Sequence, residues 1–238
     1  MSGIKLKVCG MNLNTSEVAS LRPDYLGFIF YNKSQRFFNG EIPVLSSGTS
    51  KVGVFVNAST EEISEKINKY KLDVVQLHGD ETPEFCKRLI EHFQNESSEI
   101  ESPALPVLPV LSGVEVSGVA VSRVEVWKVF GIRDSFNFEL LEAYEDVVDK
   151  FLFDTKGKEK GGNGYTFNWE VLNEYRSKKP FILSGGIGLE EIEDLKKILN
   201  TKLPVYAIDV NSKFETEPGL KNITDLKKMK QRLKKISR

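Results

Sequence analysis

Two ionisable side chains stand at the ends of short apolar runs that lie far apart in the chain. Cys9 ends the run that begins at Ile4, and Asp154 ends the run that begins at Lys150. A thiolate can remove a proton from carbon and a protonated carboxyl can donate one, so such a pair can perform general acid–base chemistry. The pair can act on one molecule only if the fold brings both run ends to a single cavity.

Apolar runs recur along the whole chain and predict eight strands. Most are nearly continuous rather than alternating, which is typical of parallel strands that are buried on both faces. The predicted strands are Ile4–Cys9, Asp24–Phe30, Lys51–Asn57, Asp73–His78, Val126–Ile132, Lys150–Asp154, Pro180–Ser184 and Pro204–Asp209.

Helical patterns lie between most of these strands. At the start of one of them, Ser59 with Glu62 three residues later forms the pattern of a capping box. After the second strand, Gly and Pro interrupt the pattern around Asn39–Ser47, which indicates a short or absent helix. The predicted helices are Thr60–Tyr70, Thr82–Phe93, Asn137–Val148, Asn168–Arg176, Leu189–Leu199 and Asn222–Ile236.

Eight strand–helix units in 238 residues predict a single (β/α)8 TIM barrel over residues 1–238, an α/β fold. A doubly wound nucleotide-binding sheet would show a Gly-rich turn after its first strand, and Gly10-Met11-Asn12-Leu13 is not such a turn. Residues 95–123, rich in Glu, Ser, Pro, Gly and Val, break the rhythm. We interpret them as an insertion between helix 4 and strand 5, either a flexible loop or a small hairpin over Val114–Val121, on the face opposite the mouth.

Composition limits the partners and the location that the sequence allows. The formal net charge of −1 gives no field that would attract nucleic acid or an acidic membrane, and the basic last segment is interpreted as a solvated helix. No apolar stretch is long enough to cross a bilayer, and the N-terminus does not resemble a signal peptide. The protein is therefore expected in the cytoplasm with its thiols reduced. The sequence does not decide between a monomer and a homodimer.

Seven stretches, in this order, carry a family resemblance. They are Lys7-Val8-Cys9-Gly10; Tyr25–Phe30 with Ser34–Phe37; Val52–Asn57; Val75–Glu81; Phe153-Asp154-Thr155 with Gly161–Gly164; Leu183–Ile187; and Ala207–Ser212. Together they resemble the phosphoribosylanthranilate isomerases of tryptophan biosynthesis. The insertion and the last helix carry no clear family signal. The resemblance implies an Amadori rearrangement of a phosphosugar, N-(5-phosphoribosyl)anthranilate, to an aminoketose, with no metal or organic cofactor.

The resemblance assigns the general base to Cys9 and the general acid to Asp154. A thiolate base should have a pKa below the free value of about 8.5. The acid must hold its proton near neutral pH, so its pKa should lie well above about 3.9. For each residue alone, a structural role is the competing interpretation: a buried small hydrophobe for Cys9 and a turn cap for Asp154.

The substrate implied by the resemblance has two anionic ends. Arg36, after the second strand, is suited to bind the anthranilate carboxylate through its planar guanidinium. The phosphate is expected above strands seven and eight, where Gly185 and Gly186 allow close approach of the backbone and Ser212 adds a hydroxyl. Lys213 stands where the family usually has glycine, so the backbone contacts of this loop are open.

Three further expectations concern the mouth of the barrel. Asp209 ends strand eight and is expected to contact sugar hydroxyls or to orient a neighbour. His78 ends strand four and either lines the mouth or is a satisfied structural histidine. The glycine-rich segment Gly157–Gly164 is expected to close over bound substrate.

Three other functions compete with the isomerase interpretation. The next synthase of the same pathway would need a lysine acid at a strand end. A ribulose-phosphate epimerase would need paired carboxylates and usually metal-binding histidines, and two histidines, His78 and His92, exclude a histidine-rich metal site. A non-catalytic phospholigand-binding module would keep the phosphate loops without the acid and the base.

Overall fold

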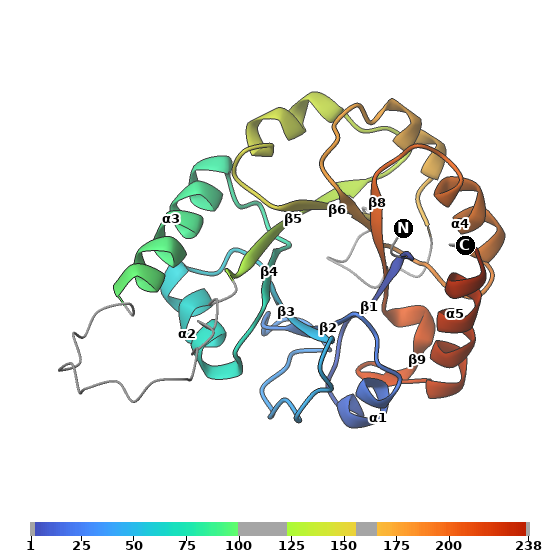
Figure 1. Cartoon of the computed structure of the whole chain (residues 1–238), viewed down its shortest axis with the longest axis horizontal. Coiled ribbons are helices and arrows are strands. Elements are labelled where there is room, and N and C mark those ends of the chain that lie inside the picture. Colours follow the sequence, from blue (N-terminus) through green and yellow to red (C-terminus); the bar gives the residue numbers. More distant parts are fainter. Residues whose placement is uncertain (1–2, 100–122, 156–165, 237–238) are drawn as a thin grey trace, which may run out of the picture.

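Eight parallel strands close into a barrel in sequence order, with helices around its outside (Figure 1). The computed structural model describes residues 3–99, 123–155 and 166–236. The strands are β1 (Lys5–Val8), β2 (Tyr25–Ile29), β3 (Ser50–Phe55), β4 (Val74–Leu77), β5 (Glu125–Ile132), β6 (Lys150–Thr155), β7 (Phe181–Leu183) and β8 (Val205–Val210). All eight strands predicted from the sequence are confirmed, with ends that shift by at most two residues.

Alternation along β1 sorts its side chains between two cores. Leu6 and Val8 belong to the large core that lies between the strands and the helices. Cys9 belongs to the smaller core inside the barrel. Because side chains on a strand point alternately to its two faces, Lys5 and Lys7 share the inward face with Cys9.

The amino-terminal end of the barrel interior is closed by aromatic rings. Trp127 is fully buried, and its ring meets that of Tyr25 edge to face with centroids 5.0 Å apart. The Lys5 ammonium donates to the Tyr206 hydroxyl at 2.6 Å, and the Tyr206 and Tyr25 hydroxyls are hydrogen-bonded at 2.7 Å. This end of the barrel interior is therefore a floor filled by side chains.

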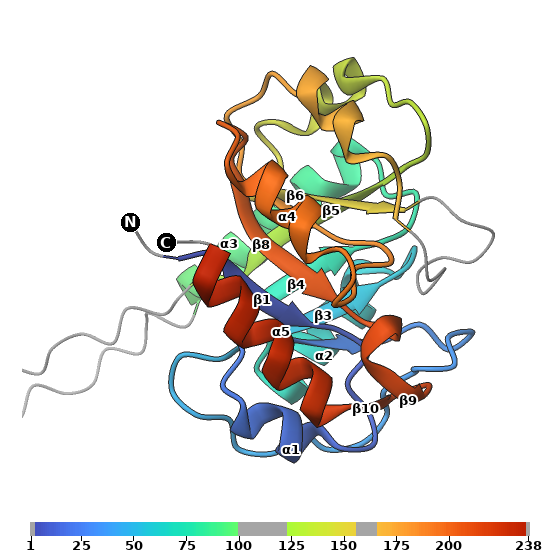
Figure 2. The same cartoon turned by 90° about the vertical axis from the view of Figure 1, so that its right-hand side faces the viewer.

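The helices pack on the outside of the ring, and Figure 2 shows α5 running along it beside α4. They are α1 (Thr15–Ser20), α2 (Thr60–Tyr70), α3 (Pro83–Glu99), α4 (Ile192–Leu199) and α5 (Ile223–Ile236), with 3₁₀ helices η1 (Phe138–Tyr144), η2 (Trp169–Glu174) and η3 (Ser212–Phe214). Helix α2 has the predicted bounds, and the Ser59 hydroxyl accepts the Glu62 N–H at 3.2 Å as the capping pattern predicted. No helix occurs between β2 and β3, also as predicted.

Several outer elements differ from prediction. The segments Asn137–Val148 and Asn168–Arg176 form the 3₁₀ helices η1 and η2 instead of α-helices. Each fully buries a single side chain, Leu141 or Leu172, which gives little of the packing that stabilises a longer helix. Helix α1 and the two-stranded pair β9 (Glu215–Glu217) and β10 (Leu220–Lys221) were not predicted.

The expected insertion at 95–123 begins later than predicted, because α3 continues to Glu99. Residues 100–122, including the possible hairpin Val114–Val121, lie outside the described residues, as does the glycine-rich segment Gly157–Gly164. In the part of the chain that the structure describes, every helix is too short or too polar to cross a membrane.

Candidate active site

One cavity of about 590 Å³ opens at the carboxyl ends of the strands. It brings together residues of β2, β3, β4, β6 and β8 with residues that follow β1, β2 and β7. All eight residues that the sequence singled out line this cavity: Cys9, Arg36, His78, Asp154, Gly185, Gly186, Asp209 and Ser212. The structure therefore joins the two ionisable strand ends at a single mouth.

Cys9 follows β1 and is almost fully buried at the base of the cavity. Its sulfur lies over Gly27 of β2, where an added Cβ would come within 2.8 Å of Sγ. Burial raises the pKa of the thiol, while the Lys7 ammonium lowers it and the Asp209 carboxylate raises it. The direction is opposite to the one expected from the sequence, because desolvation disfavours the thiolate more than the nearby cations favour it.

Asp154, near the end of β6, is buried between its own strand end and β4. Its Oδ1 accepts the Thr155 N–H at 2.9 Å, and its Oδ2 lies 3.3 Å from His78 Nε2. His78 also lies 3.4 Å, through Nδ1, from the Gln76 side-chain amide. His78 therefore lines the mouth with a polar side chain of the protein beside each ring nitrogen, which agrees with both roles left open for it.

Gly185 supports the same carboxyl group from β7. It has a φ of +90°, and a Cβ at this position would lie 2.4 Å from the Thr155 nitrogen and 2.8 Å from Asp154 Oδ1. Glycine is required here by both the backbone angle and the space. The sequence indicated a phosphate loop at this glycine and did not reveal its packing against the candidate acid.

Asp209 on β8 faces the cavity and pairs with a residue that the sequence analysis missed. Its Oδ2 lies 2.9 Å from the Lys7 ammonium and accepts the Ser184 hydroxyl at 3.2 Å. Its Oδ1 is buried without a hydrogen-bond partner among the described residues. A charged residue in a buried parallel strand, two positions before Cys9, was the signal that could have identified Lys7.

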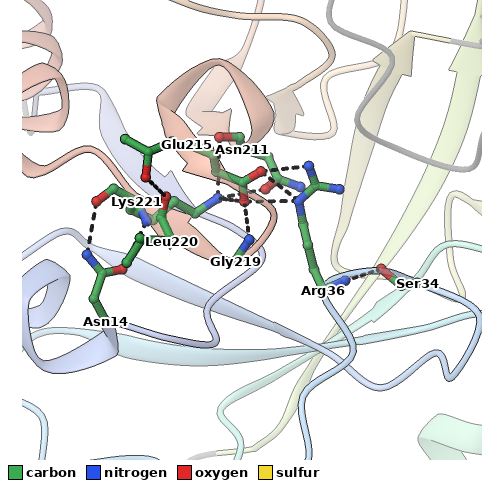
Figure 3. A network of polar contacts seen from close by, with 9 residues as sticks. Asn14, Ser34, Arg36, Asn211, Glu215, Gly219, Leu220 and Lys221 are labelled. Carbon is green, nitrogen blue, oxygen red and sulfur yellow. Dashed lines mark hydrogen bonds and ion pairs between the residues drawn. The ribbon is translucent and has the colours of Figure 1, made fainter.

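Arg36 is held at the rim by a charged cluster (Figure 3). Its Nε lies 2.9 Å from both carboxylate oxygens of Glu215, and its Nη2 lies 2.6 Å from one of them. The Lys221 ammonium binds the same carboxylate at 2.7 Å and the Asn211 side-chain oxygen at 2.7 Å. Glu215 thus occupies one edge of the guanidinium, and the edge formed by Nη1 and Nη2 can receive a second carboxylate.

The sequence did not predict this cluster, because it did not predict β9 and β10, the strands that carry Glu215 and Lys221. Asn14 fixes β10 by exchanging two hydrogen bonds of 2.9 Å with the Lys221 backbone. Burial lowers the pKa of Lys221 to about 8, although Glu215 opposes the shift. Two cations share one carboxylate, so the cluster carries a net positive charge below this pKa.

Lys213 lies exposed at the rim beside Ser212. Its backbone lies in η3 with a negative φ, so no glycine-specific angle occurs at this place. Its Cβ lies 3.3 Å from where a Cβ of Gly188 would stand, which places the side chain against the loop after β7.

The family model described as N-(5'-phosphoribosyl)anthranilate (PRA) isomerase matches residues 6–104 and 111–232. The chain belongs to the PRA isomerase family. The match includes most of the last helix and part of the expected insertion, where the sequence analysis found no clear family signal. Members of this family catalyse one step of tryptophan biosynthesis, and the protein is accordingly an enzyme that isomerises phosphoribosylanthranilate.

Relatives of known sequence and structure agree. An N-(5'-phosphoribosyl)anthranilate isomerase of Parabacteroides distasonis is 39% identical over 96% of this chain and 92% of its own. The crystal structure of the isomerase from Thermotoga maritima is 27% identical, with a TM-score of 0.71 over 98% of this chain and 99% of its own. Another solved isomerase, 25% identical with a TM-score of 0.68 over 98% of this chain and 99% of its own, was determined in complex with reduced 1-(o-carboxyphenylamino)-1-deoxyribulose 5-phosphate.

The family match decides between the isomerase and the alternatives raised from the sequence, namely the synthase, the epimerase and the non-catalytic module. Among the described residues, no group of three or more His, Cys, Asp and Glu side chains is arranged to hold a metal ion.

Proposed function

We propose that Cys9 is the general base and Asp154 the general acid of this PRA isomerase, which forms 1-(2-carboxyphenylamino)-1-deoxyribulose 5-phosphate. The observation that carries the proposal is that both groups line one cavity from strands separated by β7 and β8. A sugar in this cavity can therefore meet the thiol and the carboxyl group from different sides.

The reaction needs one proton donor and one proton acceptor. Asp154 protonates the furanose ring oxygen while the C1–O bond breaks, and the nitrogen lone pair forms an iminium at C1. The iminium acidifies the C2 hydrogen, which the Cys9 thiolate removes. The C–H electron pair then forms the C1–C2 double bond of an enolamine, which tautomerises to the ketone. Each proton transfer is expected to contribute about 10²–10⁴ in rate.

His78 is placed to act on the acid rather than on the sugar alone. The 3.3 Å contact between His78 Nε2 and Asp154 Oδ2 allows the two groups to share a proton. When the carboxyl group has donated its proton to the ring oxygen, the imidazole can stabilise the resulting carboxylate.

The two anionic ends of the substrate are assigned to different groups at the rim. The free edge of Arg36 receives the anthranilate carboxylate. The backbone N–H groups of Gly185 and Gly186, with the Ser212 hydroxyl and the Lys213 ammonium, receive the phosphate. Asp209 Oδ1, which is buried without a partner among the described residues, accepts a sugar hydroxyl.

The same proposal includes the biological setting. A small phosphosugar is the partner, with no cofactor and no nucleic acid, and residues 1–238 act as one barrel domain in a monomer or a homodimer. We place the protein in the cytoplasm, since both cysteines are free and the substrate is an intermediate of biosynthesis.

Substitution of the two groups tests the proposed function. Cys9→Ser and Asp154→Asn should each lower kcat by about 10²–10⁴-fold. Neither should change much the dissociation constant of reduced 1-(o-carboxyphenylamino)-1-deoxyribulose 5-phosphate, the reduced product analogue. Cys86→Ser is the matched control, because Cys86 is a buried thiol on α3 outside the cavity. Undiminished turnover in either Cys9→Ser or Asp154→Asn would contradict the assignment, as would a loss of binding as large as the loss of turnover.

A further inference from the structure

Lys7 is a fully buried cation that the proposed chemistry does not yet use. It lies on β1 with 0% of its surface exposed, and it faces the barrel interior two residues before Cys9. Lysine is almost never fully buried without a partner, because an ammonium group loses its hydration there. A buried lysine beside a candidate base therefore calls for a reason that packing does not supply.

Strand register fixes one neighbour of Lys7. Its Cα stands opposite that of Asp209 in the pairing of β1 with β8, and the ammonium lies 2.9 Å from Asp209 Oδ2. Burial lowers the pKa of Lys7, but interactions with Asp209 and Cys9 together raise it above its usual value, so Lys7 keeps its charge. The carboxylate thus anchors an ammonium at the base of the cavity.

The ammonium nevertheless has hydrogen-bonding capacity to spare. An ammonium group has three donors, and Asp209 is the ion-pair partner of Lys7 among the described residues, at 2.9 Å. Cys9 is the other group with which Lys7 interacts. A thiolate formed at Cys9 would therefore find an adjacent cation with unused donors.

The other charged groups around Cys9 do not replace Lys7. Asp209 on β8 disfavours the thiolate, and Lys221 on β10 favours it less strongly than Lys7 does. Asp154 and His78 line the same cavity from β6 and β4. Arg36 approaches Gly10 next in the chain, but its charge is paired with Glu215.

We propose that Lys7 is a positioning residue that acts through Cys9: anchored by Asp209, its ammonium is the counter-charge of the thiolate that removes the C2 proton. This inference rests on the proposed role of Cys9 as the base. In the proton transfer, the thiolate becomes a neutral thiol, the C2 electron pair enters the enolamine, and Lys7 stays protonated throughout. The cation thus stabilises the reactive form of the base without exchanging a proton with the substrate.

The test follows the ionisation of Cys9 directly. Only the thiolate is alkylated at an appreciable rate, so the pH dependence of iodoacetamide labelling, with mass spectrometry of the Cys9 peptide, reports its titration. In Lys7→Met the midpoint should move upward by about one pH unit or more, which lowers the thiolate fraction near neutral pH about tenfold. The value of kcat should fall by a similar factor at neutral pH and recover as the pH is raised, with KM little changed.

Lys5→Met is the matched control, since it removes a lysine from the same face of the same strand at the floor of the barrel. Its Cys9 titration should match that of the unaltered protein. An unshifted midpoint in Lys7→Met, with or without a loss of activity, would show that Lys7 is structural only and would overturn the inference.

A second pair of variants covers the case in which Lys7→Met does not fold. Asp209→Asn alone should lower the midpoint, because it removes a negative charge near the thiol, and Lys7→Met with Asp209→Asn should raise it again while burying no unpaired charge. Equal midpoints in these two proteins would overturn the inference. The role of Cys9 as the base is tested by a different result: full turnover in Cys9→Ser would contradict it, whatever the midpoints of the Lys7 variants.

Discussion

The two ends of the barrel interior contain similar residue types but use them differently. At the amino-terminal end, Lys5 binds the Tyr206 hydroxyl and Lys150 binds Glu125, each at 2.6 Å. At the carboxyl-terminal end, Gln76 Oε1 and Asp209 Oδ1 are buried without a hydrogen-bond partner among the described residues, and Lys7 Nζ is buried with Asp209 Oδ2 as its ion-pair partner. The two other such atoms among the described residues lie on α1 and η2, outside the ring of strands.

This difference suggests that residues at the floor stabilise the fold and that residues at the mouth serve binding and turnover. A buried polar atom without a partner costs free energy, so it is retained where another molecule can satisfy it. The floor satisfies its own polar groups and fills its space with rings, whereas the mouth leaves both space and hydrogen-bonding groups open. Changes at the floor should therefore affect unfolding, and changes at the mouth should affect turnover or binding.

The largest effect is expected at the floor. Trp127→Ala removes a fully buried ring and should lower the free energy of unfolding by about 3–5 kcal/mol, measured by denaturant titration. In the folded fraction, kcat should stay close to that of the unaltered protein. A fall in kcat of the fully folded variant would show that the floor and the mouth are coupled, and would contradict the separation of their roles.

At the mouth, Gly185→Ala should reduce kcat roughly 10²-fold, because the added Cβ displaces Asp154 or Thr155 and a small misplacement of an acid is costly. Steady-state kinetics at saturating substrate measures the change in kcat. Gly48→Ala is the matched control, since Gly48 has a φ of +97° but no atom within 4 Å of the added Cβ. Equal losses in the two variants would assign the effect to backbone strain alone.

Glu215→Gln should act on binding. The neutral amide binds Arg36 Nε more weakly than the carboxylate does and no longer pairs with the Lys221 ammonium. Arg36 is then less well positioned to bind substrate, so KM should rise about tenfold while kcat changes little. Glu217→Gln, an exposed change two residues along β9, should leave both constants unaltered. If kcat fell and KM did not, Glu215 would belong to the chemical step instead.

The smallest effect concerns pH. Since burial lowers the pKa of Lys221 to about 8, the cluster with Arg36 and Glu215 loses its net positive charge as the pH rises through that value. The affinity for the reduced product analogue should weaken a few-fold over this interval, as measured by calorimetry. Lys221→Met should remove this dependence, and an unchanged pH profile in that variant would exclude Lys221 as its source.

The strands were predictable from the sequence because each is an apolar run with polar ends, and Cys9 and Asp154 were recognisable because they stand at two of those ends. Their proposed catalytic roles came from the family resemblance, since a thiol and a carboxyl group at strand ends have ordinary structural uses. Helix α1 has only six residues, too few for a clear helical period. Lys7, Glu215 and Lys221 act through partners on other strands, and such pairings depend on register that local patterns do not contain.

Side chains on β1 alternate between the barrel interior and the outer core, so the register of this strand decides which side chains reach the cavity. A slip of one residue would turn Lys7 and Cys9 outward into the apolar layer beneath the helices and bring Leu6 and Val8 into the lumen. Such a chain would bury an ammonium in hydrocarbon and would present no thiol to the sugar. The two side chains that we propose act in proton transfer therefore also favour the correct register of the first strand, because a misaligned chain would be unstable.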